Sequence, residues 1–145
     1  MIPDESVAYA LAAWKRFDDG VSDGLLRAVA GAFVLVAAAD GELSRDEADR
    51  FVEMLRSKAD VFAPIDFAEL AKTFRDLSEA MIADPEDGKR LALQYVARVK
   101  GVPQHAELVQ SGAEIAAAAD GRLEYVEESV MRDVREALGV DAATG

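Results

Sequence analysis

The carboxylate residues whose spacing is best suited to chemistry occur in two matched segments. Residues 37–43 read AAADGEL, and residues 117–123, eighty positions later, read AAADGRL. A glutamate follows each aspartate by seven positions, which gives the pairs Asp40/Glu47 and Asp120/Glu127. An early aspartate, a glycine turn and a late glutamate resemble the arrangement of an EF-hand, in which oxygen ligands hold Ca²⁺. The pattern therefore indicates candidate sites for a hard divalent cation.

Two interpretations of these segments remain open. In the first, each aspartate folds over the following glycine and accepts N–H groups from its own loop or from the next helix, so that it serves only as a cap. In the second, Asp40 and Glu42 supply oxygens to a cation and Glu47 completes the shell. The loop is shorter than an EF-hand loop and lacks its alternating Asp/Asn ligands. Arg122 stands where the first segment has Glu42, so the first loop is expected to bind a cation more tightly.

Residues for enzymatic catalysis are scarce. The absence of cysteine excludes Cys-His arrangements and zinc-thiolate sites, and the sole histidine, His105, is expected to be a surface residue rather than a ligand or base. The Glu-x-x-His pair of di-iron bundles is missing, because Val102 lies three residues before His105. Residues 84–87 form a further acidic cluster, which is expected to cap the start of a helix. The chain is therefore predicted not to be an enzyme, and a metalloenzyme that uses carboxylates alone is the least favoured alternative.

Composition indicates a soluble, acidic, globular protein. The chain has 145 residues, of which 51% are hydrophobic, and its 28 acidic and 16 basic residues give a net charge of −12. Such a charge repels nucleic acid and anionic membranes. The start of the chain lacks the basic and apolar regions of a secretion signal, and no apolar run approaches the about 20 residues that span a bilayer. These features predict a cytoplasmic protein without direct membrane insertion.

Hydrophobic periodicity predicts an all-α fold of about seven helices in one domain, residues 1–145, with a core of about 18–141. Ser44 and Glu47 form a capping box at the start of the third helix. The predicted helices cover about 4–17, 23–39, 45 to before Pro64, 66–82, 84 to before Gly101, 104–119 and 124–138. The repeat predicts that halves of about 22–58 and 104–138 are related by a pseudo-twofold axis.

The second predicted helix is apolar on nearly every side, which is typical of a helix at the centre of a bundle. Gly31 in its middle predicts a close approach of another backbone. The predicted inward faces are Ala48, Phe51, Val52 and Leu55 in the third helix, Phe67, Leu70, Phe74, Leu77 and Met81 in the fourth, Leu91, Tyr95 and Val99 in the fifth, and Val126, Val130, Val134 and Leu138 in the seventh. The residues expected to be buried are Phe33, Val36, Phe51, Leu55, Phe74, Tyr95, Ile115 and Val134.

Four segments together resemble the TerB-like family, named after tellurite-resistance protein B. They are AADGELSRDE at residues 38–47, AADGRLEYVE at 118–127, the acid-Pro-acid and Gly-Lys segment at 84–89, and ALGV at 137–140. The resemblance covers residues of about 18 to 141. Two Asp-Gly elements at the correct separation between helices make it fairly specific.

The resemblance implies a compact, cytoplasmic, all-helical domain with internal pseudo-twofold symmetry. It further implies a role in resistance to tellurite and other stress, through binding of calcium or another divalent cation and through membrane-associated partners such as a TerC-like protein. The metal ligands carried over by position are Asp40, Glu42, Glu47, Asp120, Glu124 and Glu127. Arg122 departs from the family pattern and would weaken a second site by pairing with Asp120. The alternative is a purely structural or scaffolding helical interaction protein with no metal site.

Overall fold

A computed structural model describes residues 8, 12, 22–38, 43–58, 60, 62, 65–119 and 129–139 of the chain. Within these residues the protein forms six helices and no strand, so the predicted all-α fold class is confirmed. The helices are α2 (Asp23–Ala37), α3 (Arg45–Arg56), α4 (Phe67–Ala83), α5 (Pro85–Ala97), α6 (Pro103–Ala119) and α8 (Ser129–Leu138). Of the predicted first helix, only Ala8 and Ala12 are described, and both are helical.

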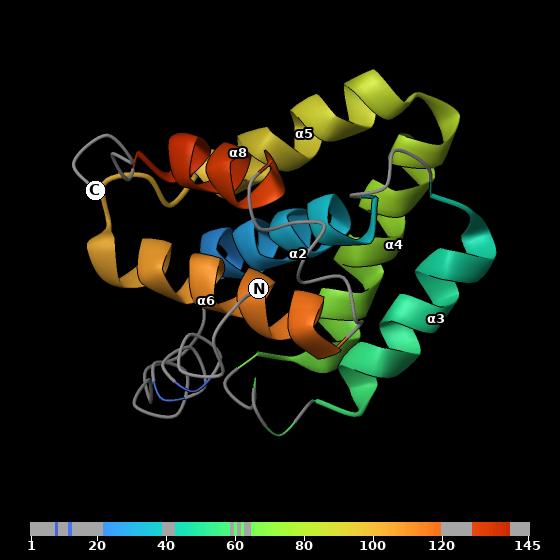
Figure 1. Ribbon diagram of the computed structural model, residues 1–145, viewed down its shortest axis with the longest axis horizontal. Coiled ribbons are helices and arrows are strands. Elements are labelled where there is room, and N and C mark those ends of the chain that lie inside the picture. Colours follow the sequence, from blue (N-terminus) through green and yellow to red (C-terminus); the bar gives the residue numbers. More distant parts are fainter. Residues whose placement is uncertain are drawn as a thin grey trace.

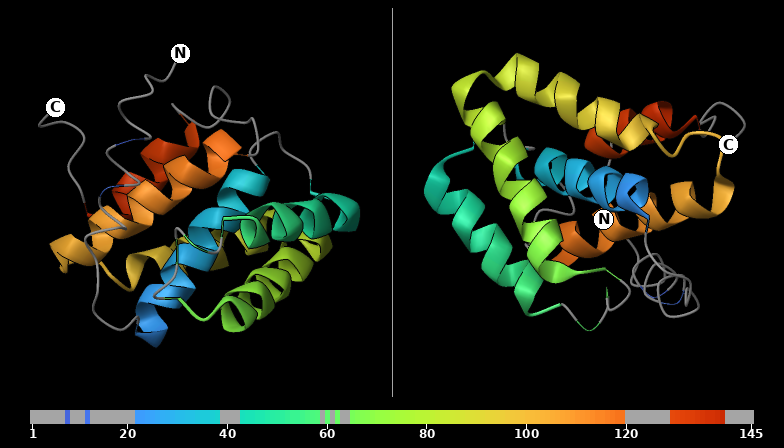
Figure 2. Two further views of the ribbon diagram at one scale, coloured as in Figure 1. Left: turned by 90° about the horizontal axis from the view of Figure 1, so that it is seen from below. Right: turned by 180° about the vertical axis from the view of Figure 1, so that it is seen from behind.

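Helix α2 lies at the centre of the molecule, as its apolar sequence predicts. It contacts α3, α4, α5, α6 and α8, and Figures 1 and 2 show these helices arranged around it. Twelve of its 15 residues are buried, from Leu25 to Ala37 with Arg27 excepted. Because nearly every side of α2 meets another helix, an apolar residue is favoured at almost every position.

Helices α3 and α4 pack together through aromatic side chains. The rings of Phe51 and Phe74 are stacked with centroids 5.2 Å apart, and Phe33 of α2 lies 6.3 Å from Phe51. The predicted inward faces of α3 and α4 are buried, except that Phe67 is only partly buried. Seven of the eight predicted core residues are buried, and the exception is Tyr95.

The predicted inward face of α5 is wrong for Leu91 and Tyr95, which are only partly buried. Its buried residues are instead Gly88, Ala92 and Val96. These small side chains let the backbone of α5 approach the neighbouring helices: a Cβ atom on Gly31 of α2 would lie 2.6 Å from the carbonyl oxygen of Ala92. The predicted close approach at Gly31 is therefore confirmed, and it rotates the larger side chains of α5 to the edge of the core.

Tyr95 packs against the edge of the core, and basic side chains lie beside its ring. The guanidinium carbon of Arg27 lies 5.7 Å from its ring centroid, and that of Arg98 lies 5.3 Å from it. A partly exposed aromatic ring favours such contacts because its face carries partial negative charge.

The two predicted repeat halves differ in their neighbours. Helix α2 contacts α4 and α5 extensively, whereas α6 packs mainly against α2 and α8. Both Asp-Gly turns lie outside the described residues. The pseudo-twofold relation between residues of about 22–58 and 104–138 therefore stays a prediction.

Candidate functional site

The first Asp-Gly segment lies in the chain between α2 and α3. Asp40 and Glu42 lie outside the described residues, but both flanks are described. On one side, the N–H of Ala38 donates to the carbonyl oxygen of Val34 at 3.0 Å and ends α2. On the other, Leu43 is partly buried against the core. The described residues on both sides of positions 39–42 therefore pack against the core.

The predicted capping box at the start of α3 is confirmed. The Ser44 hydroxyl accepts a hydrogen bond from the N–H of Glu47 at 3.1 Å. In return, Oε1 of Glu47 accepts one from the N–H of Ser44, also at 3.1 Å. Glu47 is thus the one predicted metal ligand that the described residues include, and one of its carboxylate oxygens serves the helix. A role for Glu47 as a cation ligand stays a prediction. In that role the same carboxylate would both cap the helix and bind the cation.

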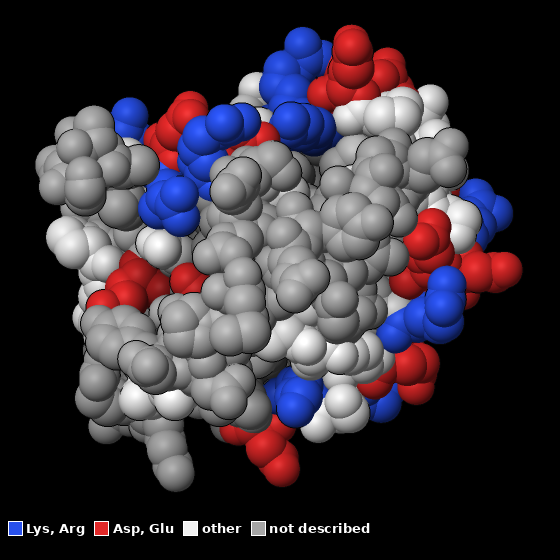
Figure 3. Space-filling model, viewed as in Figure 1, with Lys and Arg blue, Asp and Glu red and all other residues white. Residues whose placement is uncertain are grey.

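Arg45, the first residue of α3, ties this helix to α4. Its Nη2 and Nε lie 2.8 Å and 2.9 Å from the two carboxylate oxygens of Glu79. The hydrogen bond and the charge of Arg45 lower the pKa of Glu79, and those of Glu79 raise the pKa of Arg45. Sequence reasoning missed this pair because its members are separated by 34 positions. Figure 3 shows acidic and basic side chains mixed along the edge formed by α3.

The Arg45–Glu79 pair makes a testable prediction about titration. We expect Arg45→Ala to raise the pKa of Glu79 toward its ordinary value of 4.5, because the guanidinium that favours the carboxylate is removed. A lowered pKa in the folded state stabilises the fold above the unfolded pKa, and this contribution disappears as the pH falls through the lowered value. Side-chain NMR titration measures the pKa of Glu79 in wild type and variant, and Arg56→Ala serves as the control. Identical titration of Glu79 in wild type and Arg45→Ala would show that the pair does not form in solution.

The second Asp-Gly loop is flanked by α6 and α8. Its candidate ligands lie outside the described residues: Asp120, Glu124 and Glu127. Helix α6 ends at Ala119, and α8 begins at Ser129. An ion pair of 3.2 Å between Lys89 and Asp133 joins α8 to α5. The predicted inward residues of α8 that are described, Val130, Val134 and Leu138, are buried.

The acidic cluster at residues 84–87 acts as a cap, as predicted. The carboxylate of Asp84 accepts a hydrogen bond from the N–H of Asp87 at 3.2 Å, and Pro85 is the first residue of α5. Arg90 forms an ion pair with Asp87 one turn later. Among the described residues, no group of three or more His, Asp or Glu side chains is placed to hold a metal ion.

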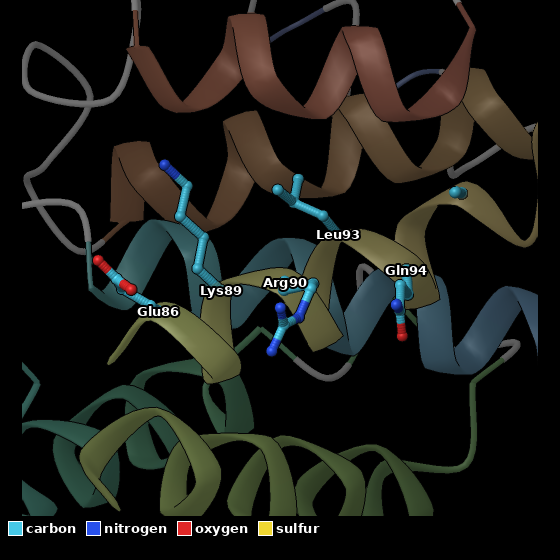
Figure 4. A pocket seen from close by; sticks show the side chains of 6 residues that line it. Glu86, Lys89, Arg90, Leu93 and Gln94 are labelled. Atoms are coloured by element: carbon cyan, nitrogen blue, oxygen red, sulfur yellow. The ribbon is translucent and has the colours of Figure 1, made fainter. Parts of the chain in front are cut away.

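The outer face of α5 carries a shallow groove that the sequence pattern does not reveal. Its volume is 420 Å³, and Figure 4 shows Leu93 between charged and polar neighbours. Its basic residues have acidic partners, since Lys89 pairs with Asp133 and Arg90 pairs with Asp87. The described residues that line it are Glu86, Lys89, Arg90, Leu93, Gln94 and Ala97.

None of the helices in the described part of the chain has the length and apolar character needed to cross a membrane. This agrees with the absence of long apolar runs from the sequence.

Comparison with known proteins identifies the family. The family model described as "Tellurite resistance protein TerB" matches residues 26–144. The match begins in α2 and includes both Asp-Gly segments and all later helices. No curated protein and no solved structure matches the chain. Because the match covers most of the sequence and the fold is all-helical, the chain belongs to the TerB family.

Proposed function

We propose that this protein is a non-enzymatic TerB domain of the cytoplasm that acts in tellurite resistance and stress response. In this proposal it binds a divalent cation, Ca²⁺ first among them, and interacts with a protein partner such as a TerC-like membrane protein. The family match supports the TerB-like role. The observation that supports the cation site is the pair of acidic residues, Asp40 and Glu42, in the short connection between α2 and α3.

This connection supports a cation site because it contains two carboxylates close together in the sequence. Asp40 and Glu42 belong to the four residues, 39–42, that lie between Ala38, the C-cap of α2, and Leu43. A short connection between fixed ends loses little conformational entropy when it is ordered around a ligand. Carboxylate and carbonyl oxygens are also the ligands that Ca²⁺ prefers.

The distribution of charge in the sequence favours a cation at these loops. Residues 39–42 and 120–128 together contain six acidic residues but only one basic residue, Arg122. This concentration attracts cations through the local field. The first loop should bind more tightly, since its Glu42 corresponds to Arg122, whose guanidinium repels a cation and competes for Asp120.

The test is calorimetry with Ca²⁺ at constant ionic strength. Wild type should bind with a dissociation constant on the order of 10⁻⁴ M, as expected for a short loop with few charged ligands. Asp40→Asn should abolish the heat because it removes a charged ligand, whereas the matched variant Asp120→Asn should retain it. Equal losses in both variants would mean that the two loops share one site. No saturable binding at millimolar Ca²⁺ would reject the cation site.

A second candidate function is a helical scaffold whose acidic residues serve only as caps. The specific observation in its favour is that the carboxylates of Glu47 and Asp84 both accept backbone hydrogen bonds at helix starts. If this alternative holds, Asp40→Asn should leave the free energy of unfolding almost unchanged with and without Ca²⁺, because Asn caps and turns about as well as Asp. Urea unfolding in both conditions separates the two functions.

A further inference from the structure

Helix α5 and the turn that follows it are basic, although the chain as a whole is acidic. Residues 88–106 contain four Lys or Arg residues and no Asp or Glu, whereas the whole chain carries a net charge of −12. The acidic residues within α5, Glu86 and Asp87, are confined to its first turn. Figure 3 shows Lys and Arg side chains gathered where α5 and α8 lie. This part of the surface therefore attracts anionic groups.

The outer face of α5 carries the shallow groove described above, while its other sides pack against α2, α4 and α8. In the groove, Lys89 and Arg90 are exposed, and Leu93 and Ala97 are half-buried. Figure 4 shows Lys89 and Leu93 directed to one side of α5 and Arg90 and Gln94 to the other. The carbon stems of lysine and arginine add to the apolar surface of such a groove. The outer face of α5 thus offers apolar surface beside cationic groups.

The cationic groups of this face can bind a further anionic group. Lys89 and Arg90 each pair with one acidic residue of the protein, yet their side chains remain 54% and 69% exposed. An ammonium or a guanidinium has more N–H donors than one carboxylate uses, so each group can also contact a second carboxylate. Beyond the groove, Arg98 and Lys100 form no ion pair within the described part of the chain. Positive charge therefore remains for a partner along the whole face.

The length of the groove sets the size of its occupant. Lys89 and Ala97 lie about two helical turns apart, which corresponds to about 12 Å along α5. An extended chain covers that distance in about four residues. A short segment is therefore long enough to place carboxylates beside the cationic groups and an apolar side chain on Leu93.

We propose that the outer face of α5 is a docking surface for a short acidic segment of a partner protein. In the complex, carboxylates of the segment contact Lys89 and Arg90, and an apolar side chain lies on Leu93. The inference deepens the partner interaction proposed above and rests on it, but it does not require the cation site. A membrane or a second copy of the chain fits less well, because the net charge of −12 opposes contact with a broad anionic surface or a like-charged molecule. A short segment meets only the basic face.

The test measures binding of the labelled synthetic peptide EELEELEE to the full chain by fluorescence anisotropy. We expect a dissociation constant on the order of 10⁻⁴ M, because exposed charge pairs and one small apolar contact each contribute little. Binding should weaken as the ionic strength rises, since salt screens exposed charges. The peptide EEAEEAEE, which lacks the apolar anchor, should bind about tenfold more weakly.

The variant Lys89→Gln/Arg90→Gln should bind EELEELEE about fivefold more weakly than wild type, because it removes both cationic groups of the groove. The matched control is Lys72→Gln/Arg75→Gln, which changes the net charge equally at two exposed positions of α4. It should bind as wild type does. Circular dichroism should show that both variants remain folded, since all four side chains are exposed. Equal binding by the two variants, or no saturable binding by wild type at millimolar protein, would overturn the docking surface.

The other possible occupants are tested with the same variants. A dimer in analytical ultracentrifugation that is dissociated by Lys89→Gln/Arg90→Gln, but not by the control, would assign the face to a second copy and overturn the proposal. Binding to vesicles of phosphatidylserine and phosphatidylcholine that depends on the same two residues would assign the face to a membrane and also overturn it.

Growth of cells on tellurite tests the function proposed above separately from the docking surface. Cells that carry Lys89→Gln/Arg90→Gln in place of wild type should lose resistance, whereas the control variant should retain it. If the variant loses peptide binding but sustains growth as wild type does, the docking surface stands and its role in tellurite resistance is rejected.

Discussion

Phe33→Ala is expected to lower the free energy of unfolding by about 3–5 kcal/mol, the range found when a large aromatic side chain is removed from a packed core. Phe33 lies on the central helix α2 and is fully buried. Its ring contacts Phe51 of α3 at 6.3 Å and Phe62 at 5.5 Å between centroids, the latter edge to face. Its removal therefore leaves a cavity where several parts of the chain meet.

Urea unfolding of wild type and variant measures the effect, provided that the slope of the transition is the same in both. Phe67→Ala is a suitable control, because Phe67 is only partly buried and is covered by Arg56 at 5.1 Å. Its loss should be clearly smaller, since water already reaches part of the ring. A loss below about 1 kcal/mol for Phe33→Ala would show that the site collapses without a cavity.

The sequence predicts those parts of the fold in which local pattern and packing agree. Helix α2 is apolar around its circumference, and burial from all sides follows directly from that composition. Ser44 and Glu47 form the box that their spacing predicts, because a cap requires only neighbouring residues. The inward faces of α3, α4 and α8 could be predicted for a similar reason, because each depends on one helical periodicity and one buried side.

The orientation of α5 could not be predicted from hydrophobicity. Two adjacent faces of this helix could pack against the core: one carries Leu91 and Tyr95, and the other carries Ala92 and Val96. Hydrophobic bulk favours the first face, but α2 presents Gly31 to α5, and a close approach selects the small residues. Gly31 indicates that some backbone comes near, although the sequence does not show which one.

The candidate site shows the same difference between local contacts, which the sequence predicts, and contacts between distant residues, which it does not. The cap at Glu47 is local and was predicted, whereas the Arg45–Glu79 contact depends on how α3 meets α4 and leaves no sequence pattern. Asp40, Glu42, Asp120, Glu124 and Glu127 lie outside the described residues, so their roles as cation ligands stay predictions.

Gly31→Ala is expected to lower the free energy of unfolding by about 1–3 kcal/mol, the usual effect of forcing an extra group into a packed core. Alanine is the better helix former by up to about 1 kcal/mol, so propensity alone predicts the opposite sign. Packing should prevail, because the new Cβ would lie 2.6 Å from the carbonyl oxygen of Ala92 and 3.3 Å from Cβ of Tyr95. A backbone atom cannot rotate away as a flexible side chain can, so α2 and α5 would have to separate.

Gly24→Ala provides the matched control within the same helix. A Cβ on Gly24 would meet its nearest neighbour, the Ser22 hydroxyl, only at 4.0 Å. With space available, the substitution should raise the free energy of unfolding by about 0.4–1 kcal/mol, since alanine has less freedom to lose from the unfolded chain. Urea unfolding of both variants beside wild type measures the difference. If Gly31→Ala were as stable as Gly24→Ala, α2 and α5 would not pack backbone to backbone, and the small-residue face of α5 would need another explanation.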